Sequence, residues 1–342
     1  MITNTILEEW FTKNTKGFMH FPESSADYVL RYQSIKDYLV KHVYPLIGAA
    51  TSAEDGGIYT DHGPEHFDQV IRYAATLLGL ETGDENIVLN VYEVYLLLTS
   101  ILLHDAGNIY GRNQHEKKPF EILLQMGPTI AADNIEKKII AKIAEVHGGR
   151  SVTGDKDTIG QRFIQEEEIY LNTRYRPRII ASVVRFADEI CEDRTRAARF
   201  LLNGDLPPKS EVYHQYANSI TSVNVDKQDR SVRIQYDILV TETQKKFGKN
   251  NEKVYLIDEI FERLEKMNCE KNYCRRFAPE IIKIDSIKAV VNLLDSDYEL
   301  IDQLSITCEE LGYPISTINL SGNHSSWVGS SLKKRHEGVS NA

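Results

Sequence analysis

The first two hundred residues follow a helical pattern of apolar and polar positions. Across residues 28–47, apolar side chains recur three and four positions apart, and Pro45 lies near the end of this run. Residues 85–104 are apolar on nearly every side, which is typical of a helix at the centre of a bundle. We therefore expect this part of the chain to fold as a helical bundle.

Further signals in the same region predict more helices and one long loop. Residues 48–63 are rich in small and polar side chains and should form a loop. Pro64 suits a first helical turn, so a helix is predicted to begin there. Residues 135–146 predict another helix, which two glycines end. The last helix of the bundle is predicted to begin at Pro177 and to run to residue 202.

The period changes after residue 204. Residues 205–210 contain two adjacent prolines and resemble a linker, and the alternation in SVNV and VRIQYDIL then predicts a β-hairpin. Helices at 255–267 and 298–311 and strands at 281–291 and 316–320 are predicted to follow. The predicted fold is mainly α: a helical domain over residues 1–204 and a smaller α+β domain over residues 205–342, with a mobile tail from about residue 322.

The net charge of the chain limits which nucleic acids or nucleotides it is expected to bind. The formal net charge is −10, and such a field repels a polyanion, so stable binding to duplex nucleic acid is not expected. A local pocket with a divalent cation and a few arginines can still bind a small nucleotide.

The cysteines and apolar runs bear on location. The four cysteines contain no CxxC pair, so we expect reduced thiols in the cytoplasm and no disulfide framework. The N-terminus has no signal-peptide pattern, and the longest apolar run, residues 94–103, is shorter than the roughly 20 residues of a membrane span. No membrane association is expected.

An adjacent His104-Asp105 pair follows the most apolar predicted helix. A buried imidazole and carboxylate cost several kcal/mol unless they are paired or coordinated. A divalent metal ion would satisfy both, since both side chains are good ligands. Alone, the pair could also be a helix end at which His104 caps carbonyl groups and Asp105 faces water.

Two other polar residues favour the metal interpretation. His66 lies in the first turn of its predicted helix, and Asp188 lies beside core positions of another. The order of His, His-Asp and Asp on successive helices resembles the HD superfamily of metal-dependent phosphohydrolases, over roughly residues 55–200 and most closely in EHFDQVIRYA, LLTSILLHDAGN and IIASVVRFADEICEDRTRA. The resemblance implies an HD-type helical bundle in which His66, His104, Asp105 and Asp188 bind the metal.

Three more histidines are candidates for the site, and two of them have a second interpretation. His62 corresponds to the general acid of HD cyclic-nucleotide phosphodiesterases, or it caps the start of a helix. His115 and Glu116 resemble a catalytic His-Glu pair of deoxynucleoside triphosphate triphosphohydrolases, although the gap from the HD pair is shorter here. His147 corresponds to an additional ligand of two-metal HD proteins, or it is a histidine favoured at a helix C-terminus by the helix dipole.

The basic residues near these motifs suggest phosphate binding. Arg112, Lys117 and Arg150 could neutralise phosphate charge, whereas Arg185 is more simply explained by pairing with Glu189 one helical turn away. A divalent ion (Mn, Mg, Co, Ni or Fe; one ion, or two) would activate a water for attack on phosphorus.

The leading hypothesis for function is hydrolysis of a (deoxy)nucleoside triphosphate. The alternatives are a phosphodiesterase acting on cyclic nucleotides or oligonucleotides, and a catalytically silent HD module that binds a nucleotide and signals. The C-terminal domain would be regulatory or oligomerising, in a homo-oligomer with a nucleotide effector. Its NYCRRF segment, residues 272–277, is either an effector pocket, a subunit interface or an ordinary helix end.

Overall fold

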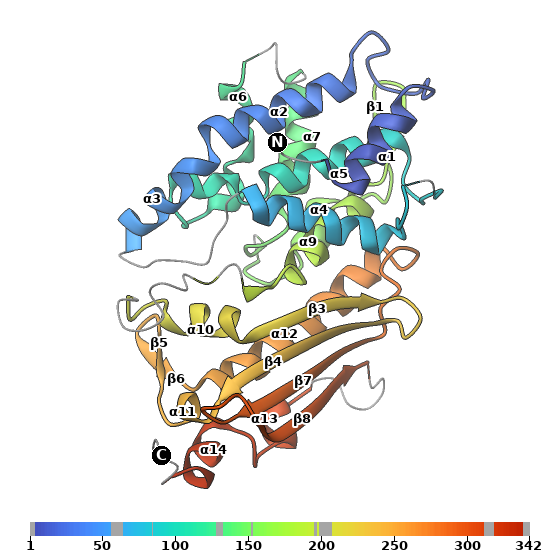
Figure 1. The fold of residues 1–342 in the computed structure, drawn as a ribbon. Coiled ribbons are helices and arrows are strands. Elements are labelled where there is room, and N and C mark those ends of the chain that lie inside the picture. The colour runs from blue at the N-terminus through green and yellow to red at the C-terminus, as the bar shows by residue number, and fades with distance from the viewer. Residues whose placement is uncertain are drawn as a thin grey trace. The chain divides into compact units, whose positions relative to one another are not determined.

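The computed structural model describes residues 4–55, 64–83, 85–127, 133–151, 153–194, 197, 207–310 and 318–337. The chain forms two compact units: the first contains residues 1–54, 62–191 and 274–282, and the second contains residues 55–61, 192–273 and 283–342. The first is mostly helical, and the second contains a four-stranded sheet (Figure 1). The predicted mainly α fold with an α+β part is confirmed. In the described residues, no helix is long and apolar enough to cross a membrane.

Nine α-helices, two short 3-10 helices and a small hairpin follow one another along the described part of the first two hundred residues. They are α1 (Ile6–Thr15), α2 (Tyr28–His42), α3 (Tyr44–Asp55), α4 (Pro64–Leu78), α5 (Val91–Leu103), η1 (Ala106–Tyr110), η2 (His115–Lys117), α6 (Pro119–Gln125), α7 (Asn134–Glu145), α8 (Thr158–Arg162), β1 (Glu168–Tyr170), β2 (Thr173–Tyr175) and α9 (Pro177–Glu189).

Helix α5 is the centre of the first unit. Every residue of this helix is buried, and it packs against α1, α2, α4, α7 and α9. It begins at Val91, later than predicted, because Asn90 and Glu93 form a reciprocal capping box at its start. Just before it, the Glu85 carboxylate accepts main-chain hydrogen bonds that hold a turn. The helix therefore ends at the His104-Asp105 pair with apolar packing on all sides.

Two predicted boundaries were wrong. Helix α3 continues to Asp55, where a loop was expected from residue 48, because this stretch contains several alanines, which are the best helix formers. Helix α9 ends at Glu189 and does not run on to residue 202. Residues 56–63 and 198–206 lie outside the described residues.

The second unit is built on one mixed sheet. Its strands are β3 (Ile220–Asp226), β4 (Ser231–Leu239), β7 (Ser286–Leu294) and β8 (Leu300–Glu309), in the order β3-β4-β7-β8. The β3–β4 pair is the predicted hairpin, and β4 and β7 are parallel. Parallel neighbours need a long connection, and the chain between them contains α11 (Val240–Thr243), the hairpin β5 (Phe247–Lys249) with β6 (Glu252–Val254), and α12 (Leu256–Phe277).

A buried tyrosine pair joins the sheet to helix α10 (Glu211–Ser219). The hydroxyl groups of Tyr216 on α10 and Tyr236 on β4 lie 3.3 Å apart. The Arg263 guanidinium of α12 lies 5.1 Å from the centre of the Tyr216 ring. Tyr216 of α10 therefore contacts both β4 and α12.

The helix predicted over residues 298–311 is wrong, because β8 occupies this place. Leu304, Ile306 and Cys308 are buried while the residues between them are exposed, which is the period of a half-buried strand. Residues 311–317 lie outside the described residues, so the strand predicted at 316–320 is not described as such; Leu320–Asn323 form the short helix α13. The tail expected to be mobile contains helix α14 (Gly329–Arg335), whose Leu332 is fully buried.

A buried carboxylate joins three elements of the first unit. Glu136 of α7 is fully buried and accepts hydrogen bonds from Arg31 (2.8 Å), Tyr92 (3.0 Å) and Tyr28 (3.2 Å). Burial raises the pKa of Glu136 to about 7, although the Arg31 charge and the two tyrosine hydroxyls oppose the rise. The network joins α2, α5 and α7 at one carboxyl group.

We expect Glu136 to make the first unit less stable as the pH rises from about 4.5 to about 7. The native state holds the Glu136 proton up to about pH 7, whereas the unfolded chain releases it near its ordinary value of 4.5. The free energy of unfolding by urea, measured at pH 5 and pH 7, should therefore depend less on pH in Glu136→Gln. Glu121→Gln, which changes an exposed glutamate, is the control. An unchanged pH dependence in Glu136→Gln would contradict the assignment.

Candidate metal centre

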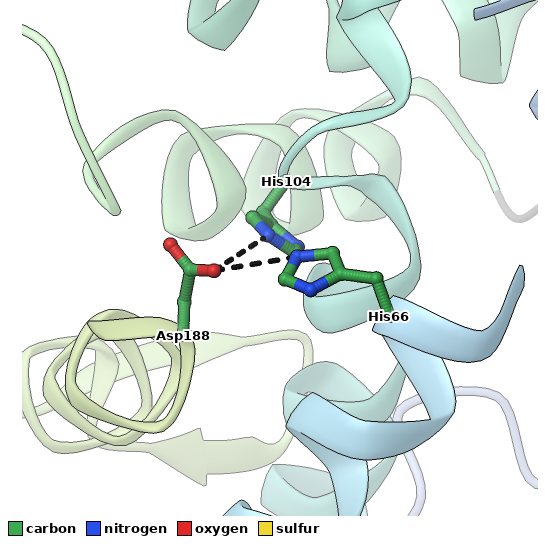
Figure 2. A group of neighbouring side chains, drawn as sticks. All are labelled: His66, His104 and Asp188. Carbon is green, nitrogen blue, oxygen red and sulfur yellow. Dashed lines mark ion pairs between the residues drawn. The ribbon is translucent and has the colours of Figure 1, made fainter. Parts of the chain in front are cut away.

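Three helices place one potential ligand each at a common point. His66 lies in the first turn of α4, His104 directly follows α5, and Asp188 lies in the last turn of α9. Their side chains point toward one another (Figure 2), and the Nε2 atoms of both histidines are 3.4 Å from Asp188 Oδ1. We call these three residues the first group; one ligand atom of each lies within 4.8 Å of the others.

Asp105 joins this group to a second one. Its Oδ1 is 2.9 Å from His115 Nε2 and 3.5 Å from His147 Nε2, and Asp105, His115 and His147 form the second group. Its other oxygen, Oδ2, is 3.5 Å from His104 Nε2 and 3.9 Å from His66 Nε2. One carboxylate therefore presents one oxygen to each group.

The turn after the HD pair explains how His115 reaches Asp105. A Cβ atom on Gly107 would overlap the carbonyl oxygen of His115, so glycine allows η1 and η2 to lie in direct contact. Asn108 is buried, and its side-chain amide donates to the carbonyl oxygen of Asp105 at 3.0 Å. The Ala-Gly-Asn sequence after the HD pair thus has a local structural role.

Main-chain carbonyls orient three of the four imidazoles. The Nδ1 atoms of His104, His115 and His147 lie 2.7, 3.0 and 2.7 Å from the carbonyl oxygens of Ile101, Arg112 and Ala144, each three residues earlier. A ring nitrogen facing a carbonyl must carry the proton, so Nε2 keeps the lone pair. Histidine ligands of metals are held in this way.

The residues fit a divalent metal ion. His104 is fully buried, and its Nε2 has no hydrogen-bond partner among the described residues. A buried polar atom without a partner is costly, and it lies here with other imidazole nitrogens and with two carboxylates. This set of nitrogen and oxygen donors suits a first-row divalent transition metal.

The electrostatics of the two groups favour positive charge. Burial opposes protonation of His104, yet the charges of Asp105 and Asp188 raise its pKa to about 9. Burial likewise opposes a charge on Asp188, but His104 and His66 hold its pKa well below the usual range. Burial also opposes protonation of His115, but its hydrogen bond to Asp105, the Asp105 charge, the Arg112 carbonyl and the Glu116 charge together raise its pKa. A cation at this point would be stabilised by the same carboxylates.

The structure brings together all the described residues that the sequence predicts as ligands: His66, His104, Asp105, His147 and Asp188. It adds His115, which the resemblance implied to be catalytic. His62 lies outside the described residues. Cys191, which no sequence pattern indicated, places its Sγ 3.6 Å from Nδ1 of His66.

A pocket of about 200 Å³ lies in the same unit. Its lining includes Glu116, Lys117 and Arg150, three of the residues predicted to act on the substrate, but not Arg112. The remaining lining residues are Glu145, Val146, Gly148, Ser151, Thr158, Gln161 and Arg162. Residues 158–162 were missed because they lie outside every motif. Arg185 is buried, and its Nη1 donates to Thr158 Oγ1 at 2.7 Å.

The HD-CE family model matches residues 57–266, more than half of the chain. The chain belongs to the HD-CE family. The match contains every residue of both groups, and the predicted resemblance to the HD superfamily is confirmed. No curated protein and no solved structure matches the chain. Membership of an HD family, with these histidine and aspartate groups, indicates a metal-dependent phosphohydrolase.

Proposed function

We propose that this HD-CE protein hydrolyses nucleotides at a centre of two divalent metal ions, with (deoxy)nucleoside triphosphates as its substrates. The position of Asp105 carries the proposal. Its two oxygens face two separate sets of imidazoles, and a carboxylate placed in this way can hold two ions side by side.

The ligands divide between the two ions. His66, His104 and Asp188, with Oδ2 of Asp105, would hold one ion; His115 and His147, with Oδ1 of Asp105, would hold the other. When bound, such ions lower the pKa of a coordinated water and polarise phosphoryl oxygens. The imidazoles contribute by presenting Nε2 lone pairs that their Nδ1 contacts have already oriented.

The contacts of His115 support metal binding as its role instead of proton transfer. Its Nδ1 donates to the carbonyl of Arg112, and its Nε2 faces Asp105, so neither nitrogen is left to deliver a proton to a substrate. Glu116 both lines the pocket and lies 3.6 Å from His115 Nδ1, and the proton transfer expected of the His-Glu pair falls to this carboxylate. His62 stays the predicted proton donor to the leaving group.

The pocket favours a triphosphate over a cyclic or oligomeric substrate. Lys117 and Arg150 add positive charge to a protein whose net charge is −10. A phosphodiesterase is the second candidate, because two ions held by one carboxylate also suit the in-line cleavage of a phosphodiester. The silent-module alternative is disfavoured, since every predicted ligand in the described residues is present.

Metal content tests the two-ion arrangement. Wild-type protein loaded with Mn²⁺ and dialysed should retain two ions per chain, and His147→Ala should retain one, because only the second group loses a ligand. Asp105→Ala should lose most of both. Elemental analysis of the dialysed protein gives the ratios, with the exposed His42→Ala on α2 as the control. A wild-type ratio of one that His147→Ala leaves unchanged would rule out the second ion.

Product analysis tests the reaction. Metal-loaded protein should convert deoxynucleoside triphosphates to a nucleoside and tripolyphosphate, or to a lower nucleotide and orthophosphate. Asp105→Ala should lower kcat/KM by about 100-fold or more, because polarisation by the metal contributes several kcal/mol. Cleavage of cyclic nucleotides alone would favour the phosphodiesterase. Absence of any product with Mn, Mg, Co, Ni or Fe would refute the proposal.

A further inference from the structure

The pocket is formed by the segments that carry the second group. Glu116 and Lys117 belong to η2, which begins at His115, and Val146, Gly148 and Arg150 flank His147. Gly149 has a φ of +70°, and a Cβ there would lie 2.8 Å from Glu116 Oε1. This glycine therefore lets the segment after α7 lie against Glu116. The pocket and the two histidines form one continuous local structure.

Within the described residues, two of the three cations that line the pocket have no carboxylate partner. Arg162 pairs with Glu145 at 2.8 Å. Arg150 donates through Nη1 to the carbonyl of Gly154 at 2.7 Å, and for Lys117 no partner occurs within the described part of the chain. A guanidinium has five N–H donors, so most of those on Arg150 are available to a ligand.

The size and lining of the pocket suit part of a nucleotide better than a whole one. A volume of about 200 Å³ is below the roughly 300 Å³ at which drug-sized ligand sites begin. Its lining residues include no aromatic side chain on which a base could stack. Two cations without a carboxylate partner in a small pocket suit phosphate groups, which cationic side chains bind through charge-assisted hydrogen bonds.

We propose that this pocket binds the phosphates of the substrate that are not attacked, and that it thereby selects chains of two or more phosphates. The inference rests on the proposed function, because it takes the cleaved phosphorus to lie at the two groups. Lys117 and Arg150 would bind the remaining phosphates from the side of His115 and His147. A monophosphate or a simple phosphodiester has no group to place there.

Direct binding tests the pocket without hydrolysis. Inorganic tripolyphosphate and orthophosphate are titrated calorimetrically into metal-loaded protein, with the free metal concentration buffered because polyphosphates chelate divalent ions. Wild type should bind tripolyphosphate more tightly, and Lys117→Met and Arg150→Met should each weaken this about tenfold, as expected for a lost charged hydrogen bond. Lys142→Met, an exposed lysine on α7, is the matched control and should bind as wild type.

Kinetics with two substrates separate this inference from the proposed function. The two variants should raise KM for a nucleoside triphosphate by a larger factor than KM for bis(p-nitrophenyl) phosphate, whereas the control Lys142→Met should leave both values as in wild type. Equal affinity of wild type for tripolyphosphate and orthophosphate, or unaltered tripolyphosphate binding in both variants, overturns the inference even if hydrolysis is confirmed. Lysine- and arginine-dependent tripolyphosphate binding without hydrolysis of any nucleotide supports the pocket and refutes the proposed function.

A separate contact concerns His66. The other three imidazoles are oriented by carbonyls, whereas Nδ1 of His66 lies 3.6 Å from the buried Sγ of Cys191. Cys191 donates through Sγ to the main-chain carbonyl of His66 at 4.0 Å, and its backbone N–H donates to the carbonyl of Asp188 at 3.0 Å. Cys191 thus contacts two residues of the first group.

We infer that Cys191 is a positioning residue for the first metal ion. With the thiol hydrogen directed to the His66 carbonyl, the sulfur can accept the Nδ1 hydrogen of His66. The lone pair of His66 then lies on Nε2, which faces Asp188. Cys191 thereby does for His66 what the carbonyl oxygens do for His104, His115 and His147.

The positioning role of Cys191 is tested by measuring Mn²⁺ affinity in variants that remove or replace its sulfur acceptor. Cys191→Val keeps an apolar side chain of similar size and removes the acceptor, so Mn²⁺ affinity at the first group should fall about 10- to 100-fold, as for other residues that orient metal ligands. Cys191→Ser restores an acceptor and should keep most of the affinity. The control is Cys274→Val, at another buried cysteine.

Thermal unfolding of the metal-free variants separates positioning from a structural role. Equal melting temperatures with weaker Mn²⁺ binding in Cys191→Val alone support the inference; Cys191→Ala serves in its place if the valine variant does not fold. Wild-type affinity in Cys191→Val, or equal losses in the serine and valine variants, overturns it.

Discussion

The carboxylate of Asp105 is the constraint on which the rest of the site depends. It lies directly after a helix with no exposed face, and its two oxygens are each within 4 Å of imidazole nitrogens from separate segments. Two partly buried carboxylates, with imidazole nitrogens directed at them, need a cation. The adjacent glycine and asparagine, the carbonyl-bound histidines and the contact of η1 with η2 are all arranged around this requirement.

The apolar helix α5 determines how strongly that constraint acts. Because all of its residues are buried, charges at its end are shielded from water, and their interactions are stronger than at a surface. The aspartates accordingly raise the pKa of His104 to about 9 even though burial opposes the charge. The same surroundings would hold a metal ion tightly. The apolar sequence of α5 thus affects both the packing of the first unit and the electrostatics of the His104-Asp105 pair that follows this helix.

The pocket extends the site in one direction. His115 and His147 each have a pocket-lining residue next to them in sequence, so the proposed metal-binding and substrate-binding residues would lie on the same short turns. Cys191, which follows the end of α9, contacts His66 of the first group. Substrate selection and metal orientation would therefore depend on different residues, which can be varied independently.

The sequence alone was sufficient for the helical bundle and the β-hairpin, because these depend on local periodicity. Its resemblance to the HD superfamily singled out His66, His104 and Asp188 as candidate ligands, and the structure brings these three residues together. The sequence-based prediction was wrong where the secondary structure of a segment depends on pairing with a segment distant in sequence. Residues 298–311 form a strand because β7 offers an edge with which β8 pairs, which no local pattern reveals.

Two further contacts also depend on tertiary structure. His115 and His147 both face Oδ1 of Asp105, and Cys191 lies next to His66. In each case the chain folds residues from separate turns together around one charge or one ring nitrogen. The identity of the candidate ligands and their helical register are local properties, so they could be read from the sequence. The division of these ligands into two groups became visible only in the fold, because packing sets the distances between separate turns.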